Sequence, residues 1–253
     1  GVAREAGHFL KEERKSFRRE VVQEKHAHDY VSYVDKASEK KVVSALRKLL
    51  PEAGFIAEEG SAAYSDETYC WVVDPLDGTT NYIHDNAPYC VSIALRDKQS
   101  LLLGVVYEPC RDECFYAWKG GGAYVNGERL RVSLVSEPKD AFVVTELPYN
   151  FEQYARTGEH LIHELYGKVA GIRMNGSAAL ALCYVAAGRF DAWLEAFIGK
   201  WDFSAAALMV LEAGGKVKDF LGNENFIEGH HIIATNGPLH PLFLRLVREA
   251  LPF

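Results

Sequence analysis

The segment WVVDPLDGTTN, residues 71–81, constrains the fold of this chain more than any other stretch. Three apolar residues lead into Asp74, and Asp77 follows three positions later with Pro75 between the two acids. A turn needs a proline, one Asp and a glycine, so the second acid and the threonines after Gly78 remain unexplained. An acid at the end of an apolar strand lies at the edge of a core. The segment therefore predicts a buried strand that carries carboxylates to a site.

The apolar periodicity of the remaining chain predicts layers of helices and sheets, an α/β fold. Helices are expected over 1–20, 36–50, 152–167, 176–187 and 202–213, and after Pro238, with Asp35 placed to cap the second. Strands are expected at 55–57, 70–73, 89–96, 101–107, 113–118, 141–145, 171–174, 190–194, 217–220 and 231–234, with a hairpin near 120–127. We expect one domain over 1–253, with halves at approximately 1–145 and 146–253.

The amino-acid composition limits which classes of protein this chain can belong to. The 253 residues, 48% of them hydrophobic, are enough for one large globular domain, and no apolar run is long enough for a membrane span. The first twenty residues are charged and contain no signal-peptide core. A formal net charge of −7 argues against nucleic acid as the main ligand. The five cysteines form no CxxC pair, which favours reduced thiols in a cytoplasmic protein.

Acidic residues recur where apolar segments begin or end. Glu58 follows the strand-like FIA, Asp74 and Asp77 follow WVV, and Asp202 precedes the apolar run FSAAALMVLEAGG. Carboxylates brought together repel unless they are protonated, paired or bound to a cation. Basic residues are scarce in these segments. A site of carboxylates without His or Cys suits hard cations such as magnesium, manganese or calcium.

Each acid also has a purely structural interpretation. Taken alone, Asp202 is typical of a helix N-cap and Glu58-Glu59 is typical of a solvated turn. Asp77-Gly78 alone is typical of an ordinary turn. An EF-hand loop fails because Leu76 and Gly78 stand where acids are needed. An aspartyl-nucleophile phosphatase needs acids two positions apart, and the chain contains no P-loop, GxSxG or HExxH motif.

Three elements together resemble the inositol monophosphatase family. They are Glu58-Glu59 after a strand, the segment WVVDPLDGTTNY at 71–82, and WDFSAAA at 201–207 followed by EAGG at 212–215. The resemblance covers nearly the whole chain. It implies the layered αβαβα sandwich of the inositol monophosphatase and fructose-1,6-bisphosphatase type. It also implies a lithium-sensitive, metal-dependent phosphomonoesterase that forms a homodimer.

The resemblance implies a role for each matching residue. Two or three Mg²⁺ ions, or Mn²⁺, would be bound by Glu58, Asp74, Asp77 and Asp202, and by the Leu76 carbonyl. The catalytic group would comprise Thr79, Asp35 and Glu58, with Asp35 orienting the Thr79 hydroxyl toward water. Substrate would contact Gly78, Thr79, Gly176, Ser177, Ala178 and Glu195. Lys25 lies near the position of the family's mobile-loop lysine.

The resulting hypothesis is hydrolysis of inositol 1-phosphate, or a similar small sugar or polyol phosphate, by metal-activated water. Fructose 1,6-bisphosphate and 3′-phosphoadenosine 5′-phosphate remain alternative substrates. Two other classes stay open: a regulatory binding protein that retains the fold, and a structural calcium-binding protein. We expect no membrane partner.

Overall fold

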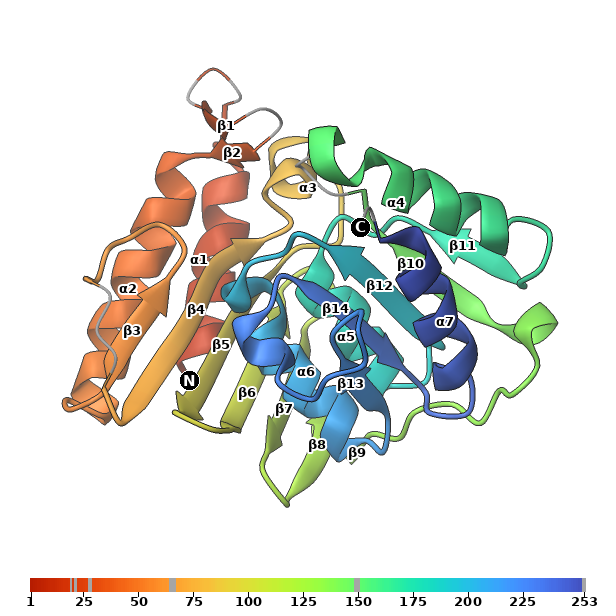
Figure 1. Ribbon diagram of the computed structural model, residues 1–253. Helices are drawn as coiled ribbons and strands as arrows, with labels where there is room; N and C mark the ends of the chain where they lie inside the picture. Colours follow the sequence, from red (N-terminus) through yellow and green to blue (C-terminus); the bar gives the residue numbers. More distant parts are fainter. Residues whose placement is uncertain (19, 21, 27–28, 64–66, 148–150, 252–253) are drawn as a thin grey trace.

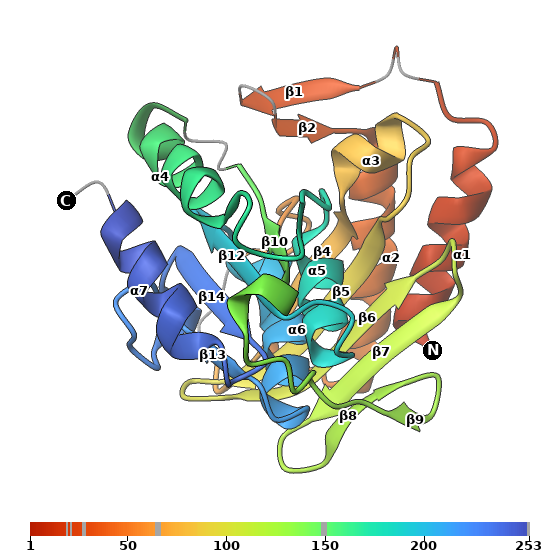
Figure 2. The same cartoon turned by 90° about the vertical axis from the view of Figure 1, so that its right-hand side faces the viewer.

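The computed structural model describes residues 1–18, 20, 22–26, 29–63, 67–147 and 151–251, excepting the side chains of 23–30 and 151. Figure 2 shows five layers in succession: a helix pair, a seven-stranded sheet, a second helix pair, a five-stranded sheet and a third helix pair. The predicted layered α/β architecture is therefore confirmed.

The first sheet comes from the N-terminal part of the chain. Its strands, in spatial order, are β3 (Gly54–Ala57), β4 (Tyr69–Asp77), β5 (Cys90–Asp97), β6 (Leu101–Glu108), β7 (Glu113–Trp118), β8 (Gly122–Val125) and β9 (Glu128–Arg129). Only β3 and β4 pair in parallel, and the later strands form an antiparallel meander. Strand β4, next to the edge strand β3, is buried from Cys70 onward, as expected for a strand covered on both faces.

Helices α1 (Val2–Arg14) and α2 (Tyr33–Leu49) cover one face of this sheet (Figure 1). Leu10, Val42 and Val73 lie in the shared core. The prediction of a first helix extending to residue 20 is wrong, because the helix ends at Arg14. Phe17 instead leaves the helical path and packs edge-on against Tyr82, with 5.3 Å between ring centroids.

The predicted cap of α2 is also wrong. Ser32, not Asp35, is the N-cap, and its hydroxyl accepts the Val34 N–H at 3.1 Å. Asp35 occupies the third helical position and accepts the Ser32 N–H at 2.8 Å, which completes a capping box. The helix therefore begins three residues earlier than expected and holds Asp35 in a fixed orientation.

The second sheet comes from the C-terminal part of the chain. Its strands, in spatial order, are β11 (Gly171–Arg173), β10 (Phe142–Thr145), β12 (Ala192–Ala196), β14 (His231–Thr235) and β13 (Lys216–Lys218). The first three are parallel, and β14 pairs antiparallel with both β12 and β13. Strand β12 starts two residues later than predicted, and Asp191, just before it, binds Phe142 through its side chain, whose carboxylate accepts the Phe142 N–H at 2.7 Å.

Helices α4 (Phe151–Leu165) and α7 (His240–Ala250) lie on the outer face of the second sheet (Figure 2). Between the two sheets lie α5 (Ala178–Ala186), which is buried throughout, and α6 (Lys200–Glu212), which is buried from Phe203 to Val210. Helices that are apolar on every face belong in such an interior layer. The packing is close: a side chain at Gly104 of β6 would come within 2.3 Å of the Ala205 carbonyl oxygen of α6.

The remaining elements lie at the edges. Helix α3 (Thr79–Ile83) follows β4 directly, and β1 (Gln23–His26) pairs with β2 (Asp29–Val31) in a ribbon that was not predicted. Short helical turns span Pro138–Asp140 and Phe226–Glu228. The five cysteines are all free thiols. Among the residues described above, none of the helices has the length and apolar character to span a membrane.

Candidate functional site

A cavity of about 600 Å³ opens where β4 ends, between the two sheets. The residues that line it come from the ends of β3, β4, β10, β11 and β12 and from the starts of α3, α5 and α6. They are Glu58, Asp74, Leu76, Asp77, Gly78, Thr79, Thr80, Glu146, Leu147, Met174, Gly176, Ser177, Ala178, Glu195, Phe197, Ile198, Gly199, Trp201 and Asp202. No Lys, Arg or His is among these described lining residues, so the cavity is strongly acidic.

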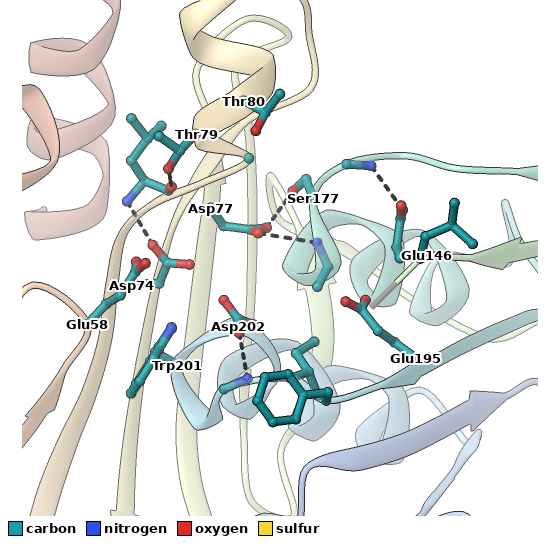
Figure 3. A pocket seen from close by; sticks show the side chains of 18 of the residues that line it. Glu58, Asp74, Asp77, Thr79, Thr80, Glu146, Ser177, Glu195, Trp201 and Asp202 are labelled. Atoms are coloured by element: carbon teal, nitrogen blue, oxygen red, sulfur yellow. Dashed lines mark hydrogen bonds between the residues drawn. The ribbon is translucent and has the colours of Figure 1, made fainter. Parts of the chain in front are cut away.

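The spacing of Asp74 and Asp77 is explained by a break in strand pairing. Asp74 lies opposite Ser92 of β5, while Asp77 lies opposite Cys90, so three steps along β4 match two along β5. Residues three apart on a regular strand face opposite sides, and an extra residue returns them to the same side. Pro75 fits at such a bulge because it cannot donate to the ladder. Figure 3 shows both carboxylates in the same pocket.

Asp77 is fixed by four donors from two elements. Its carboxylate accepts hydrogen bonds from the Ser177 hydroxyl, from the backbone N–H groups of Ala178 (3.2 Å) and Ala179 (2.9 Å), and from the Cys90 thiol (3.4 Å). Burial raises the pKa of Asp77, and these donors oppose that rise. Asp77 therefore joins the first sheet to the start of α5.

Asp202 stands in the first turn of α6, where its carboxylate accepts the Gly199 N–H at 2.8 Å. It therefore stabilises the helix start from within the helix and is not the N-cap residue. Carboxylate oxygens of Asp74, Asp77 and Asp202 lie within 4.8 Å of one another (Figure 3). Burial, and then the neighbouring carboxylates, raise the pKa values of Asp74 and Asp202 well above their usual range. An all-oxygen set without a cationic neighbour fits a hard divalent cation.

Glu58 lies beside this cluster, as Figure 3 shows, and its charge contributes to the raised pKa of Asp74. The loop that carries it is held by Glu39, a fully buried residue of α2. The Glu39 carboxylate accepts the N–H groups of Glu59 and Ser61, both at 2.6 Å. Sequence reasoning did not identify Glu39. Its position on the inner face of a helix otherwise rich in exposed charge was the available signal.

The hydroxyl of Thr79 lies 3.1 Å from the Asp35 carboxylate and 2.9 Å from the Leu76 carbonyl oxygen, and it donates to both acceptors in turn or together. The second oxygen of Asp35 accepts the Ser32 hydroxyl at 2.7 Å. Gly78 has φ +89°, and a side chain there would come within 3.1 Å of both the Pro88 and Gly176 carbonyl oxygens. Gly78 thus permits the tight turn that brings Thr79 to the pocket.

The loop before α5 forms the opposite wall. Asn81 donates to the carbonyl oxygens of Pro88 (2.8 Å) and Asn175 (3.0 Å), which gives this residue the role that its motif alone did not reveal. The Glu146 carboxylate accepts the N–H groups of Asn175 (2.6 Å) and Gly176 (2.9 Å). The predicted substrate residues Gly176, Ser177 and Ala178 are therefore held between α3 and the end of β10.

Two further acids lie beyond the aspartate cluster (Figure 3). Burial raises the pKa of Glu146 to about 7, against the effect of its two backbone donors. Burial and the charge of Glu146 hold the pKa of Glu195 well above its usual range. One oxygen of Glu195 is buried without a hydrogen-bond partner. Such an atom is costly unless a ligand or water satisfies it.

The predicted site residues described with their side chains thus all lie in or directly behind one cavity. Their roles remain predictions. Sequence reasoning missed Glu146, a single acid after a strand, and the apolar residues Leu147, Met174 and Phe197 of the cavity wall. Lys25 belongs to β1, but its side chain lies outside the described residues.

Comparison with known proteins gives consistent matches. The family model described as the inositol monophosphatase family matches residues 1–251. A protein named Nus factor SuhB from Pseudomonas aeruginosa is 45% identical over 240 residues, covering 91% of this chain and 87% of that protein. An inositol-1-monophosphatase from Caulobacter vibrioides is 39% identical over 235 residues, covering 90% of this chain and 91% of that protein.

A solved structure agrees along almost the whole length. The extragenic suppressor protein suhB from Bartonella henselae superposes with a TM-score of 0.90 at 36% identity, covering 98% of this chain and 96% of that one. The similarity of fold and the similarity of sequence therefore both extend over nearly the whole chain.

Proposed function

The chain belongs to the inositol monophosphatase family, and from that premise we propose that it is a magnesium-dependent phosphomonoesterase acting on inositol 1-phosphate or a similar small polyol phosphate. The observation that carries this proposal is the meeting of Asp74, Asp77 and Asp202 in a cavity whose described lining residues include no basic side chain. A phosphate dianion can enter so acidic a cavity only together with cations.

The donor set fits magnesium, which binds carboxylate and carbonyl oxygens and keeps several waters. We propose that Asp74, Asp77, Asp202 and Glu58 hold the ions, with the Leu76 carbonyl as a further ligand. When bound, the ions supply charge neutralisation of the phosphate and of the leaving oxygen, and they acidify water. Manganese would satisfy the same donors.

The protein's own groups orient the attacking water. Because the Thr79 hydroxyl donates toward Asp35 and the Leu76 carbonyl, its lone pairs remain available to accept a hydrogen bond from water. Asp35 is itself fixed by the Ser32 hydroxyl and N–H. We propose that this chain of hydrogen bonds turns a water lone pair toward phosphorus, while the N–H groups of Gly78 and Thr79 bind the phosphate oxygens.

The outer acids favour a substrate with hydroxyl groups. Glu195 presents an unsatisfied oxygen, which a sugar or polyol hydroxyl can satisfy. A second phosphate, as in fructose 1,6-bisphosphate or 3′-phosphoadenosine 5′-phosphate, would face Glu146 and Glu195 with no described basic lining residue to offset its charge. We therefore place both bisphosphates below the monophosphates as substrates.

A phosphate-release panel tests the proposal. Inositol 1-phosphate, fructose 1,6-bisphosphate and 3′-phosphoadenosine 5′-phosphate are each assayed with magnesium, after chelation, and with added lithium. We expect release from the monophosphate, loss on chelation and inhibition by lithium. Equal turnover after complete chelation would exclude the metal-dependent mechanism, and faster release from either bisphosphate would exclude the substrate assignment.

A second candidate function rests on the names of several relatives. Proteins named Nus factor SuhB from Pseudomonas aeruginosa and Escherichia coli are 45% and 39% identical to this chain. A regulatory role through partner proteins or RNA therefore stands beside the enzymatic one. Partners captured from lysate equally by the native chain and by Asp77→Asn would support a role independent of catalysis.

We further propose a homodimer in the cytoplasm, which is the expectation from the family and from the five free thiols. Light scattering at micromolar concentration tests the dimer, and fractionation of cells that express the chain tests the cytoplasmic location.

A further inference from the structure

Phe197 has a backbone conformation that is unusual for an aromatic residue. It follows β12 directly, and its φ is +60°, in the left-handed region that glycine adopts freely. A bulky residue is strained there, and such strain persists mainly where function or the surrounding structure requires it. Phe197 also lines the cavity, between Glu195 and the start of α6. The strained residue therefore lies at the candidate site itself.

Two histidines hold this backbone in place. The Phe197 N–H donates to Nδ1 of His231 at 3.3 Å, so Nε2 carries the proton and donates to the Tyr154 hydroxyl at 3.1 Å. The next residue, Ile198, donates its N–H to the His230 carbonyl oxygen at 2.9 Å. The conformation is thus fixed from β14 on one side and α4 on the other.

The ring of Phe197 is available to a ligand. Its side chain is 43% exposed, whereas Tyr154, whose ring stacks against it at 5.9 Å and 30°, is only 4% exposed. Leu147 and Met174, also in the cavity wall, are 54% and 51% exposed. The outer part of the cavity therefore combines an apolar surface, backed by a rigid buried ring, with the unsatisfied carboxyl oxygen of Glu195.

This combination matches the chemistry of a ring polyol or sugar. Such a molecule has an apolar face of C–H groups and an edge of hydroxyl groups. An aromatic ring accepts the face, and a carboxyl group beside it accepts the hydroxyls. An acyclic phosphate such as glycerol 2-phosphate has no comparable face.

We propose that Phe197 is a specificity-determining residue, whose ring packs against the C–H face of a cyclic polyol or sugar phosphate and selects it over acyclic phosphates. The proposal rests on the proposed phosphatase function and names the substrate class of the same site.

Three variants separate the ring from the backbone strain. Phe197→Ala removes the ring and keeps a Cβ at positive φ, Phe197→Gly removes both, and Phe197→Tyr keeps the ring. Each is assayed with inositol 1-phosphate and with glycerol 2-phosphate. We expect kcat/KM for the ring substrate to fall about tenfold in both the Ala and Gly variants and to be retained in Tyr. The value for glycerol 2-phosphate should change less than about twofold.

Thermal unfolding of the same variants controls for a structural role. Glycine relieves the strain, so Phe197→Gly should unfold at a temperature no lower than Phe197→Ala. Equal losses for both substrates, no loss for either, or a changed oligomeric state without a change in selectivity would each overturn the proposal.

A binding measurement keeps the proposal testable even if the native chain hydrolyses neither phosphate, an outcome that would reject the proposed function. Saturation-transfer NMR with free myo-inositol reports contact between ring C–H protons and the protein without any reaction. Saturation transfer to the ring C–H protons from the native chain and from Phe197→Tyr, but not from Phe197→Gly, supports the aromatic contact. Equal transfer from all three proteins, or none from the native chain, rejects it.

Discussion

The two ends of the cavity are both built from carboxylates, but the protein holds them differently. At the inner end, Asp77 accepts four hydrogen bonds, and Asp74 and Asp202 each accept one from the backbone. At the outer end, Glu195 keeps one buried oxygen without a partner and shares the cavity lining with the exposed side chains of Leu147, Met174 and Phe197. The three inner aspartates are therefore oriented before any ligand binds. The free oxygen of Glu195 gains a hydrogen-bond partner only when a ligand binds.

This difference indicates a division of tasks. Donors fixed on a carboxylate favour its charged form and set its direction, which suits the binding of a cation at a defined position. A carboxyl group left unsatisfied in a desolvated wall suits a neutral, hydroxyl-rich group that can donate to it. The predictions below test whether the two ends act separately.

Replacing Asp77 should have the largest effect, because it removes a charge from the inner end. We expect Asp77→Asn to lower kcat/KM for inositol 1-phosphate by about a thousandfold or more. Steady-state phosphate release measures this. Asp97→Asn is the matched control, since Asp97 accepts two backbone N–H groups in the β5–β6 turn, outside the cavity lining. Full turnover by Asp77→Asn at low magnesium would remove Asp77 from the metal site.

Removal of the Thr79 hydroxyl should have the second largest effect on activity. Thr79→Ala leaves the acids intact but removes the group that orients water, so kcat should fall about a hundredfold with little change in KM. Thr79→Ser retains a hydroxyl and should recover most of the rate. A change confined to KM would mean that Thr79 binds substrate without orienting water.

At the outer end the effect should be smaller and selective. Glu195→Gln should raise KM for inositol 1-phosphate about tenfold, because an NH2 group replaces one of the carboxyl oxygens that can accept a substrate hydroxyl. Glycerol 2-phosphate kinetics and magnesium affinity should stay unchanged, and the exposed Glu152→Gln serves as control. A loss of magnesium affinity in Glu195→Gln would contradict the separation of the two ends.

The smallest effect concerns stability and pH. Burial raises the pKa of Glu146 from 4.5 to about 7. Between these values the folded protein retains a proton that the unfolded chain has released, so the contribution of Glu146 to the free energy of unfolding falls as pH rises. Glu146→Gln removes this dependence. Relative to the native chain, the variant should gain on the order of 1 kcal/mol between pH 5 and pH 8.

Chemical denaturation at both pH values measures that gain. The other buried acids titrate in both proteins, so their contributions largely cancel in the difference. An unchanged difference between native chain and variant across this range would place the titration of Glu146 below pH 5.

The sequence named the acids that meet at the inner end and, through the family resemblance, Glu195 at the outer end, but it did not name Glu146 or Glu39; the roles of all these residues stay predictions. A bulge that brings two acids to one side of a strand needs Pro75 and is followed by Gly78, and both leave a local signature. Glu146 and Glu39 act on backbone groups of loops far away in the chain, so no neighbouring residue marks them.

The helices and strands were also predicted unevenly from the sequence. Alternating and apolar runs identified most helices and strands, but the ends of several were misplaced, one through a long-range contact and one through a local cap. The first helix ends early because Phe17 packs on Tyr82, and the second begins early because Ser32 caps it in place of Asp35. The strain at Phe197 also had no signal, since φ depends on contacts with His231, from another strand.

The hydrogen bond between Asp77 and Ser177 joins residues 100 positions apart. During synthesis, the ribosome must therefore release most of the chain before the Asp77 carboxylate can be fixed. Contacts of such high sequence separation form late and slowly. If Asp77 binds a cation as proposed, that site cannot assist the earliest steps of folding of the first sheet, and divalent ions should accelerate only the final closure of the two sheets around the middle helices.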